Sequence, residues 1–197
     1  MLVRDYMTRS PLVVSVETEV RRAFQLLKKH GFRQFPVVKD GKLVGIVTDR
    51  DLRTTLLRPN LTVEEIMTIN PVTIGEDASL GAAMLILEKE KFNALPVVSK
   101  SRELTGIITV TDVLDALISL LGFREAQTRI CVEVPEGDSL PLWEIIRTIQ
   151  IGGGEVLSVM SEKRDVKMYY ISAAKCNIKD VAKKLREKGA SVVGVGE

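Results

Sequence analysis

Residues able to carry catalysis or hold a metal are scarce in this chain. It has one histidine, two cysteines and one tryptophan among 197 residues, and aromatic residues make up 5% of it. His30 has no second histidine or cysteine pair with which to build a metal site or a nucleophile–base pair. The phosphate-cradling loop Gly-x4-Gly-Lys-Ser/Thr is missing, and Cys131 and Cys176 do not make a disulfide framework. The sequence therefore predicts no catalytic residue, no metal site and no enzymatic activity.

Strong charge and long apolar runs are also missing. The net charge is +2, and no run of Lys and Arg forms the basic face that nucleic-acid binding requires. The apolar stretch from Val113 to Leu121 is broken by Asp115 and is too short to span a bilayer. The first residues, Met-Leu-Val-Arg-Asp, lack the apolar core of a signal peptide. We therefore expect no nucleic-acid or membrane partner, and a cytoplasmic location.

What is present is an internal repeat of about sixty residues. Met7-Thr8-Arg9-Ser10-Pro11 recurs at Met67-Thr68-Ile69-Asn70-Pro71. The segment 32–38, Phe-Arg-Gln-Phe-Pro-Val-Val, recurs as Phe-Asn-Ala-Leu-Pro-Val-Val at 92–98. Gly-Ile-Val-Thr at 45–48 recurs sixty-one positions later, so the second copy has one extra residue near Ser101. Three blocks in one register indicate a duplicated structural unit.

Each repeat reads as strand, helix, strand, strand, helix. A strand over 12–16 precedes a helix whose apolar stripe has the i, i+3, i+4, i+7 spacing and whose end is marked by Gly31. Two strands joined at Asp40-Gly41 follow, and a second helix begins near Asp51. The stripes are Val20, Ala23, Phe24 and Leu27 in the first repeat and Leu80, Ala83, Met84 and Leu87 in the second, and a capping box at Thr62-Val63-Glu64-Glu65 opens a short linker helix.

A Thr-x-x-Asp block stands at the start of the second helix in both repeats. Thr48 and Asp51 form the first, and Thr109 and Asp112 the second. The threonine hydroxyl and the unpaired N–H groups of a helix N-terminus suit a phosphate, whereas the aspartate suits the two hydroxyls of a ribose. A helix cap uses the same residue types, and a single copy favours that simpler role. Duplication in one register favours two nucleotide pockets. Carboxylates turned onto their own main chain, beside clefts filled by side chains, would contradict this interpretation.

The three repeated blocks, Met-Thr-x-x-Pro, Leu/Phe-Pro-Val-Val and Gly-Ile-hydrophobic-Thr-x-x-Asp, resemble those of the CBS domain, and the tandem arrangement resembles a CBS pair, or Bateman module. The resemblance covers about residues 1–126 and implies regulatory binding of an adenosine ligand: AMP, ADP, ATP or S-adenosylmethionine. It places adenine against Leu12 and Arg33-Gln34 in one site, and against Val72 and Asn93-Ala94 in the other.

The two expected pockets differ in charge. Arg50 lies inside the first Thr-x-x-Asp block, where a guanidinium can hold a phosphate through two hydrogen bonds, and Thr111 replaces it in the second. Asn93 likewise replaces Arg33. The first pocket is therefore expected to prefer a phosphorylated adenosine. The second is expected to hold a less charged ligand or none, and a solvated surface position is the alternative for Arg50.

The chain after Phe123 follows the order βαββαβ. A strand over 129–134 alternates apolar and polar residues, and helices with stripes from Leu142 and Ile178 are separated by two strands. Ser139 and Asn177 are expected helix caps. This order resembles the ACT domain, and a CBS pair followed by an ACT domain resembles the AcuB-like acetoin-utilisation proteins. The resemblance implies a dimer and an amino acid bound near Gly137 and Asp138, although acidic Glu136 and Asp138 oppose a carboxylate.

The sequence thus predicts an α+β protein in three parts, with CBS repeats at 1–60 and 61–126 and an ACT-like domain at 127–197. The favoured hypothesis is a non-catalytic sensor, expected as a homodimer, that acts on an unidentified partner protein. Two alternatives stay open: an enzyme of an acetoin-type pathway, and a structural adaptor whose clefts are vestigial.

Overall fold

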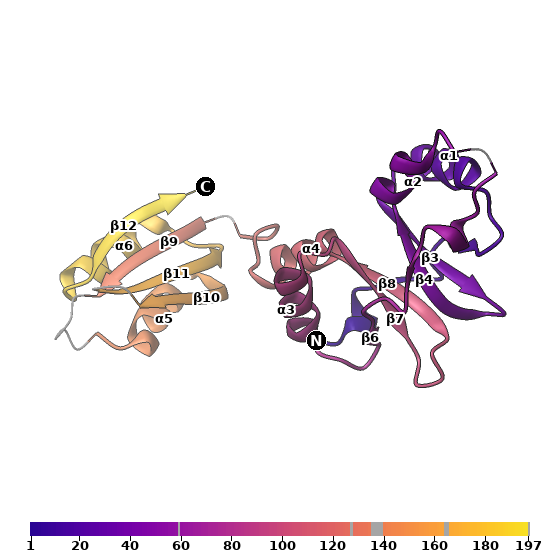
Figure 1. The fold of residues 1–197 in the computed structure, drawn as a ribbon. Helices are drawn as coiled ribbons and strands as arrows, with labels where there is room; N and C mark the ends of the chain where they lie inside the picture. The colour runs from indigo at the N-terminus through magenta and orange to yellow at the C-terminus, as the bar shows by residue number, and fades with distance from the viewer. Residues whose placement is uncertain (59, 127, 135–139, 164–165, 197) are drawn as a thin grey trace. The chain divides into compact units, whose positions relative to one another are not determined.

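The computed structural model divides into two compact units, Met1–Leu114 and Asp115–Glu197, and Figure 1 traces the chain through both. Both units mix helices with sheets, as the sequence predicts. Among the residues described, no helix is both long enough and apolar enough to cross a bilayer. The structure describes residues 1–58, 60–126, 128–134, 140–163 and 166–196.

The first unit contains two four-stranded sheets, and each is built mainly by one repeat. The strand orders are β2-β3-β4-β5 and β1-β8-β7-β6. In each sheet an antiparallel hairpin lies between a short parallel strand and a short antiparallel strand. The strands are β1 Thr8–Arg9, β2 Val14–Ser15, β3 Gln34–Lys39, β4 Lys42–Thr48, β5 Thr68–Ile69, β6 Ile74–Gly75, β7 Ala94–Val98 and β8 Leu104–Thr109. The helices are η1 Val3–Asp5, α1 Val20–His30, α2 Asp49–Thr55, η2 Val63–Glu65 and α3 Leu80–Glu90, and α4 Val110–Leu120 begins in this unit and continues past its last residue, Leu114.

The helices of this unit bury three of the four residues of each predicted stripe, while Phe24 and Met84 are partly buried. In α1 the side chains of Val20, Ala23 and Leu27 are buried, and the equivalent side chains of α3 are buried too. Gly31 ends α1 with φ 68°, and its N–H donates to the carbonyls of Leu27 and Lys28. Only glycine adopts this left-handed backbone without a steric cost, so the predicted C-cap is confirmed.

The hairpins confirm the predicted turns. Asp40 and Gly41 join β3 to β4 with φ of 49° and 77°, and two residues with positive φ match the twist of a two-residue hairpin. The second hairpin is longer, with Val98 and Leu104 at the ends of its strands and Arg102 at φ 64°. The extra residue of the second repeat lies in this turn, as predicted.

The repeats exchange their first short strands, which the sequence analysis did not foresee. β1 precedes the first repeat's own strand β2, yet it pairs with β8 of the second repeat, Thr8 opposite Ile107. β5 pairs in the same way with β4 of the first repeat. The predicted strand over 12–16 is reduced to the two residues of β2. Each Met-Thr-x-x-Pro segment therefore belongs to the sheet of the other repeat.

The exchange explains why a methionine and a glycine recur together in the sequence. A Cβ added to Gly45 would lie 2.5 Å from Met67 Sδ and 3.0 Å from Thr68 O. A Cβ added to Gly106 would lie 2.6 Å from Met7 Sδ and 2.9 Å from Thr8 O. Each glycine gives the methionine of the crossing strand room to pack against the hairpin. The Met-Thr-x-x-Pro motif of each repeat thus packs against the Gly-Ile motif of the other repeat.

The second unit has the predicted βαββαβ order, and its antiparallel sheet has the strand order β10-β11-β9-β12. Ile130, Val132 and Val134 alternate along β9 and are buried under both helices, so α5 and α6 cover one face of the sheet. The elements are β9 Thr128–Val134, α5 Leu142–Ile151, β10 Glu155–Lys163, β11 Lys167–Ala174, α6 Ile178–Glu187 and β12 Ser191–Gly196.

The predicted caps of the second unit have different outcomes. Helix α5 begins at Leu142 with Pro141 at its N-cap, whereas the predicted cap Ser139 lies outside the described residues. Asn177 does occupy the N-cap position of α6. Its side-chain amide donates to Asp180 Oδ2 at 2.8 Å and caps no backbone group.

Candidate functional site

Both Thr-x-x-Asp blocks close reciprocal caps on their own helices. Asp51 Oδ2 accepts hydrogen bonds from Thr48 N at 2.9 Å and Thr48 Oγ1 at 2.7 Å, and Asp51 N donates back to Thr48 Oγ1. Asp112 Oδ2 accepts from Thr109 N and Thr109 Oγ1 at 2.7 and 2.8 Å. These are capping boxes, which satisfy N–H groups that would otherwise lack a partner.

The caps restrict what these side chains offer to a ligand. The hydroxyl hydrogen of Thr109 is committed to Asp112 Oδ2, so in this state it is not donated to a phosphate. Each aspartate keeps Oδ1, which accepts no hydrogen bond from the described residues. Two observations together would contradict the nucleotide interpretation: carboxylates turned onto their own main chain, and clefts filled by side chains. The first of these is present, since both carboxylates turn onto their own main chain. The second, the filling of the clefts, is decided by the space beside them.

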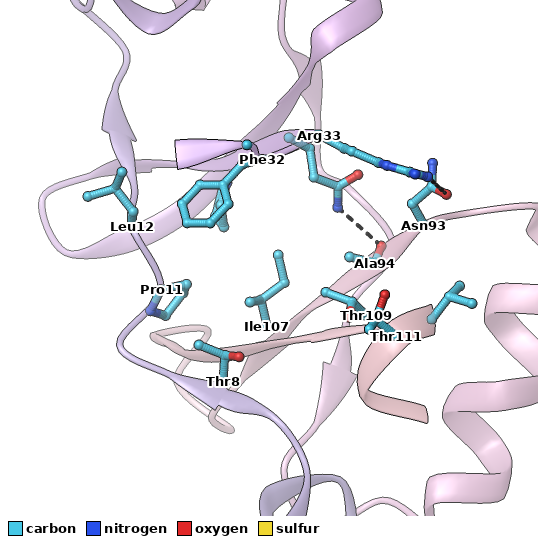
Figure 2. Close-up of a pocket in the computed structure, with 14 residues that line it drawn as sticks. Thr8, Pro11, Leu12, Phe32, Arg33, Asn93, Ala94, Ile107, Thr109 and Thr111 are labelled. Atoms are coloured by element: carbon cyan, nitrogen blue, oxygen red, sulfur yellow. Dashed lines mark hydrogen bonds between the residues drawn. The ribbon is translucent and has the colours of Figure 1, made fainter. Parts of the chain in front are cut away.

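A pocket of about 420 Å³ lies open beside Thr109, where the two repeats meet (Figure 2). Its volume falls in the usual range for a small-molecule site, roughly 300–1,000 Å³. One side is apolar, with Pro11, Leu12 and Phe32, and the side chains of Leu12 and Phe32 are 43% and 44% exposed. The described residues that line it are Thr8, Pro11, Leu12, Gly31, Phe32, Arg33, Gln34, Pro36, Asn93, Ala94, Ile107, Thr109, Val110 and Thr111.

The opposite side of the pocket is polar and joins equivalent positions of the two repeats. Arg33 Nη1 donates to Asn93 Oδ1 at 3.4 Å, and Gln34 Nε2 donates to Ala94 O at 3.4 Å (Figure 2). Thr109 and Thr111 lie on the same side, at the start of α4. The pocket therefore presents apolar surface at one end and hydrogen-bonding groups at the other.

The structure corrects how the predicted residues group. The sequence analysis assigned Leu12, Arg33 and Gln34 to one adenine site and Asn93 and Ala94 to another, but all five line this single pocket. For Leu12 the strand exchange is the reason, because β1 runs along β8 and carries the residues that follow it to this pocket. Arg33 and Gln34 reach it by donating across the repeats to Asn93 and Ala94. Arg33 of the first repeat also brings a guanidinium to the pocket beside Thr109, which the sequence analysis expected to be the less charged of the two.

The other predicted residues lie elsewhere. Thr48, Arg50, Asp51, Val72 and Asp112 do not line this pocket, although Asp112 is tied to Thr109, which does. The side chain of Arg50 is exposed. The predicted effector residues Gly137 and Asp138, with Glu136, lie outside the described residues.

Several lining residues were missed in the sequence analysis. Pro11 and Phe32 belong to the repeated blocks, so their recurrence was a usable signal. Thr8 reaches the pocket through the pairing of β1 with β8, in which it lies opposite Ile107. No local pattern indicates such a pairing.

The remaining reactive groups form no second centre within the described part of the chain. No cluster of three or more His, Cys, Asp or Glu there is placed to hold a metal ion. The ring of His30 stacks on Phe32 with 5.4 Å between centroids. Burial raises the pKa of the Cys176 thiol, which lowers its thiolate fraction at neutral pH.

Residues 3–58 and 63–119 each match the CBS domain, and together these matches cover more than half of the chain. This chain belongs to the CBS-domain family and carries the domain in tandem.

Solved structures of CBS pairs resemble this chain. The CBS domain pair of protein MJ0100, in complex with 5′-methylthioadenosine and S-adenosyl-L-methionine, is 32% identical with a TM-score of 0.56, over 60% of this chain and 97% of that one. CBSX2 in complex with AMP is 31% identical with a TM-score of 0.56, over 60% and 96%. A Vibrio cholerae protein named AcuB, for acetoin utilization, is 31% identical with a TM-score of 0.58, over 64% and 96%.

The curated enzymes that match do so through a small part of their length. An inosine-5′-monophosphate dehydrogenase of Korarchaeum cryptofilum is 40% identical over 109 residues, which are 55% of this chain and 23% of the enzyme. An L-aspartate semialdehyde sulfurtransferase of Methanocaldococcus jannaschii is matched over 22% of its length. The chain thus spans less than a quarter of these enzymes.

Proposed function

We propose that this protein is a non-catalytic sensor whose CBS pair binds an adenosine ligand: AMP, ADP, ATP or S-adenosylmethionine. The observation that carries the proposal is the open pocket between the repeats, with apolar and polar sides. Adenine would lie between Leu12 and Phe32, and the ribose and its 5′-substituent would point toward Arg33, Asn93 and Thr109. The CBS pairs crystallised with AMP, 5′-methylthioadenosine and S-adenosyl-L-methionine support this ligand class.

Regulation would follow from the position of the pocket. A ligand that contacts both repeats stabilises the arrangement in which it binds, and it shifts a conformational equilibrium by its difference in affinity for the two states. A partner protein that prefers one arrangement would read this shift. The remaining predicted residues, Thr48, Arg50, Asp51 and Val72, belong by the repeat's symmetry to a second cleft, which we propose as a further site.

Isothermal titration calorimetry with AMP, ADP, ATP and S-adenosylmethionine tests the sensor proposal directly. Micromolar binding by at least one ligand is expected, and it should weaken when Leu12→Asp places a charge on the apolar side. Ser119→Asp, at an exposed position on α4 outside the pocket, is the matched control. Absence of binding by the wild type contradicts the proposal.

For the second unit we propose an ACT-like domain that dimerises or takes an amino acid, with domain limits of 1–60, 61–126 and 127–197. The βαββαβ order and the β10-β11-β9-β12 sheet support it. Light scattering of the full chain measures its oligomeric state, and calorimetry with amino acids measures binding. A monomer that binds none of them contradicts this assignment.

A second candidate is a structural adaptor of an acetoin-type pathway with vestigial clefts. The capped carboxylates of Asp51 and Asp112 favour it, because Oδ2 of each is engaged in its own helix cap and only Oδ1 stays open to a ribose. The similarity to AcuB motivates the pathway. Partner capture that ignores every adenosine ligand would favour the adaptor over the sensor.

A further inference from the structure

The pocket beside Thr109 has an uneven distribution of charge. Among the described residues that line it, Arg33 alone has a charged side chain, and no carboxylate is among them. Both Thr-x-x-Asp carboxylates are engaged in helix caps. The pocket therefore presents a positive charge that nothing on its own walls neutralises.

The guanidinium of Arg33 is weakly engaged. Its one hydrogen bond to a side chain of the described residues, to Asn93 Oδ1, has a length of 3.4 Å, beyond the usual 2.7–3.2 Å. Asp49 lines a neighbouring pocket together with Arg33. Its carboxylate forms ion pairs with Arg53 and, at 3.8 Å, with Lys28, while its buried Oδ1 accepts no hydrogen bond from the described residues. Arg33 is thus available to an incoming anion.

We infer that Arg33 selects the ligand of this pocket by the charge of its 5′-substituent, so that adenosine phosphates are preferred to adenosines without a phosphate. The inference rests on the proposed adenosine pocket. It further specifies that the ligand is negatively charged and that Arg33 binds the charged group. A guanidinium binds a phosphate through paired, charge-assisted hydrogen bonds. The hydroxyl of Thr111 lies on the same side and has no partner among the described residues.

The sequence analysis expected a phosphorylated ligand in the first repeat's pocket, whereas the present inference places it in the pocket beside Thr109 of the second repeat. Asn93 replaces Arg33 in the second repeat, which favours an uncharged ligand there when the repeats are considered separately. Arg33 nevertheless lines the pocket beside Thr109 of the second repeat, and its guanidinium donates across the repeats to Asn93 Oδ1. The residue that chooses the ligand and the threonine beside it therefore come from different repeats.

The test compares two ligands that share adenosine and differ at the 5′-position, AMP and 5′-methylthioadenosine. The wild type is expected to prefer AMP. Since a hydrogen bond to a charged group contributes about 1.5–3 kcal/mol, Arg33→Gln should weaken AMP binding by about tenfold or more. Binding of 5′-methylthioadenosine should stay within about twofold, and Arg33→Lys should restore part of the AMP preference, because a lysine keeps the charge without the fork of donors.

Arg22→Gln is the matched control, because it removes the same charge from an exposed position of the same repeat outside the pocket. It should leave both affinities unchanged. Equal binding of the two ligands by the wild type, or loss of AMP binding through Arg50→Gln in place of Arg33→Gln, overturns the inference and leaves the adenosine pocket standing. Failure of both ligands to bind the wild type overturns the proposed function itself.

Discussion

The two repeats have matching backbones and different side chains at the same places. Asp49 N donates to Arg33 O at 2.8 Å, and at the equivalent positions Val110 N donates to Asn93 O at 3.0 Å. The same hydrogen bond thus holds an acid beside an arginine in one repeat and a valine beside an asparagine in the other. Duplication supplied two similar frames, and the chemistry of each pocket depends on a few substitutions within them.

The helices show the same contrast at larger scale. Helix α1 presents Arg21, Arg22 and Gln25 to solvent, whereas α3 presents Gly81 and the side chain of Leu85, which is 71% exposed. Both helices bury their inner stripes equally well. The fold of a repeat therefore requires only the inner face, and the outer faces are free to differ.

The sharpest test of backbone symmetry replaces the two glycines of the methionine contacts. Gly45→Val and Gly106→Val should each lower the free energy of unfolding by about 2–3 kcal/mol, because the new side chain collides with the crossing strand. Urea denaturation followed by circular dichroism measures both. An effect confined to one glycine would mean that the repeats are not equivalent. Gly81→Val, on the exposed side of α3, is the control and should cost much less.

A smaller effect is expected from the helix caps. Thr48→Ala and Thr109→Ala each remove a reciprocal cap and should cost about 1 kcal/mol of unfolding free energy without ligand. Thermal unfolding of the ligand-free protein measures this loss. A threonine that served only a ligand would leave the stability of the free protein unchanged, which would contradict the capping role.

The charge difference between the repeats can be tested by exchange. Val110→Asp places in the pocket the acid that the first repeat carries as Asp49, within reach of Arg33. Because a carboxylate opposes a phosphate and pairs with the guanidinium, AMP affinity should fall about fivefold. Calorimetry with AMP measures it, and Val110→Asn is the uncharged control. An unchanged affinity would place the phosphate away from Val110.

The smallest effect concerns pH and the two linker turns. The backbone N–H and then the hydroxyl of Thr62 hold the pKa of Glu65 below its ordinary value. The folded state thus favours the charged form, and its contribution to stability is present above the ordinary glutamate pKa and is lost as the pH falls through the lowered value. Glu65→Gln has no carboxylate to protonate, so it should not show this small loss of stability at acid pH. Asp5, at the equivalent place, accepts a hydrogen bond from Leu2 N, and Leu2 has no hydroxyl where Thr62 has one. Asp5→Asn is the comparison in the same pH series of melting temperatures.

Local signals in the sequence predicted the helices and turns of the first unit well. The stripes from Val20 and Leu80, the Asp40-Gly41 hairpin and the glycine after α1 depend on neighbouring residues and are confirmed. The pairing of β1 with β8 and of β5 with β4 was not predictable, because strands of two residues have no periodicity. Five of the residues expected at two adenine sites line one pocket, and neither repeat considered alone indicates that they lie together. The partner of a short strand is decided by packing over long sequence distances, in this case a methionine against a glycine.

The exchanged strands also determine what cleavage of the chain between the two repeats would do to each sheet. A fragment cut near residue 61 would remove β1 from the second repeat's sheet and leave the edge of β8 bare. The remaining half would lack β5 along β4 in the same way. A cut in the connecting segment would thus give two halves that each lack one edge strand. Each sheet is complete only when both repeats are present.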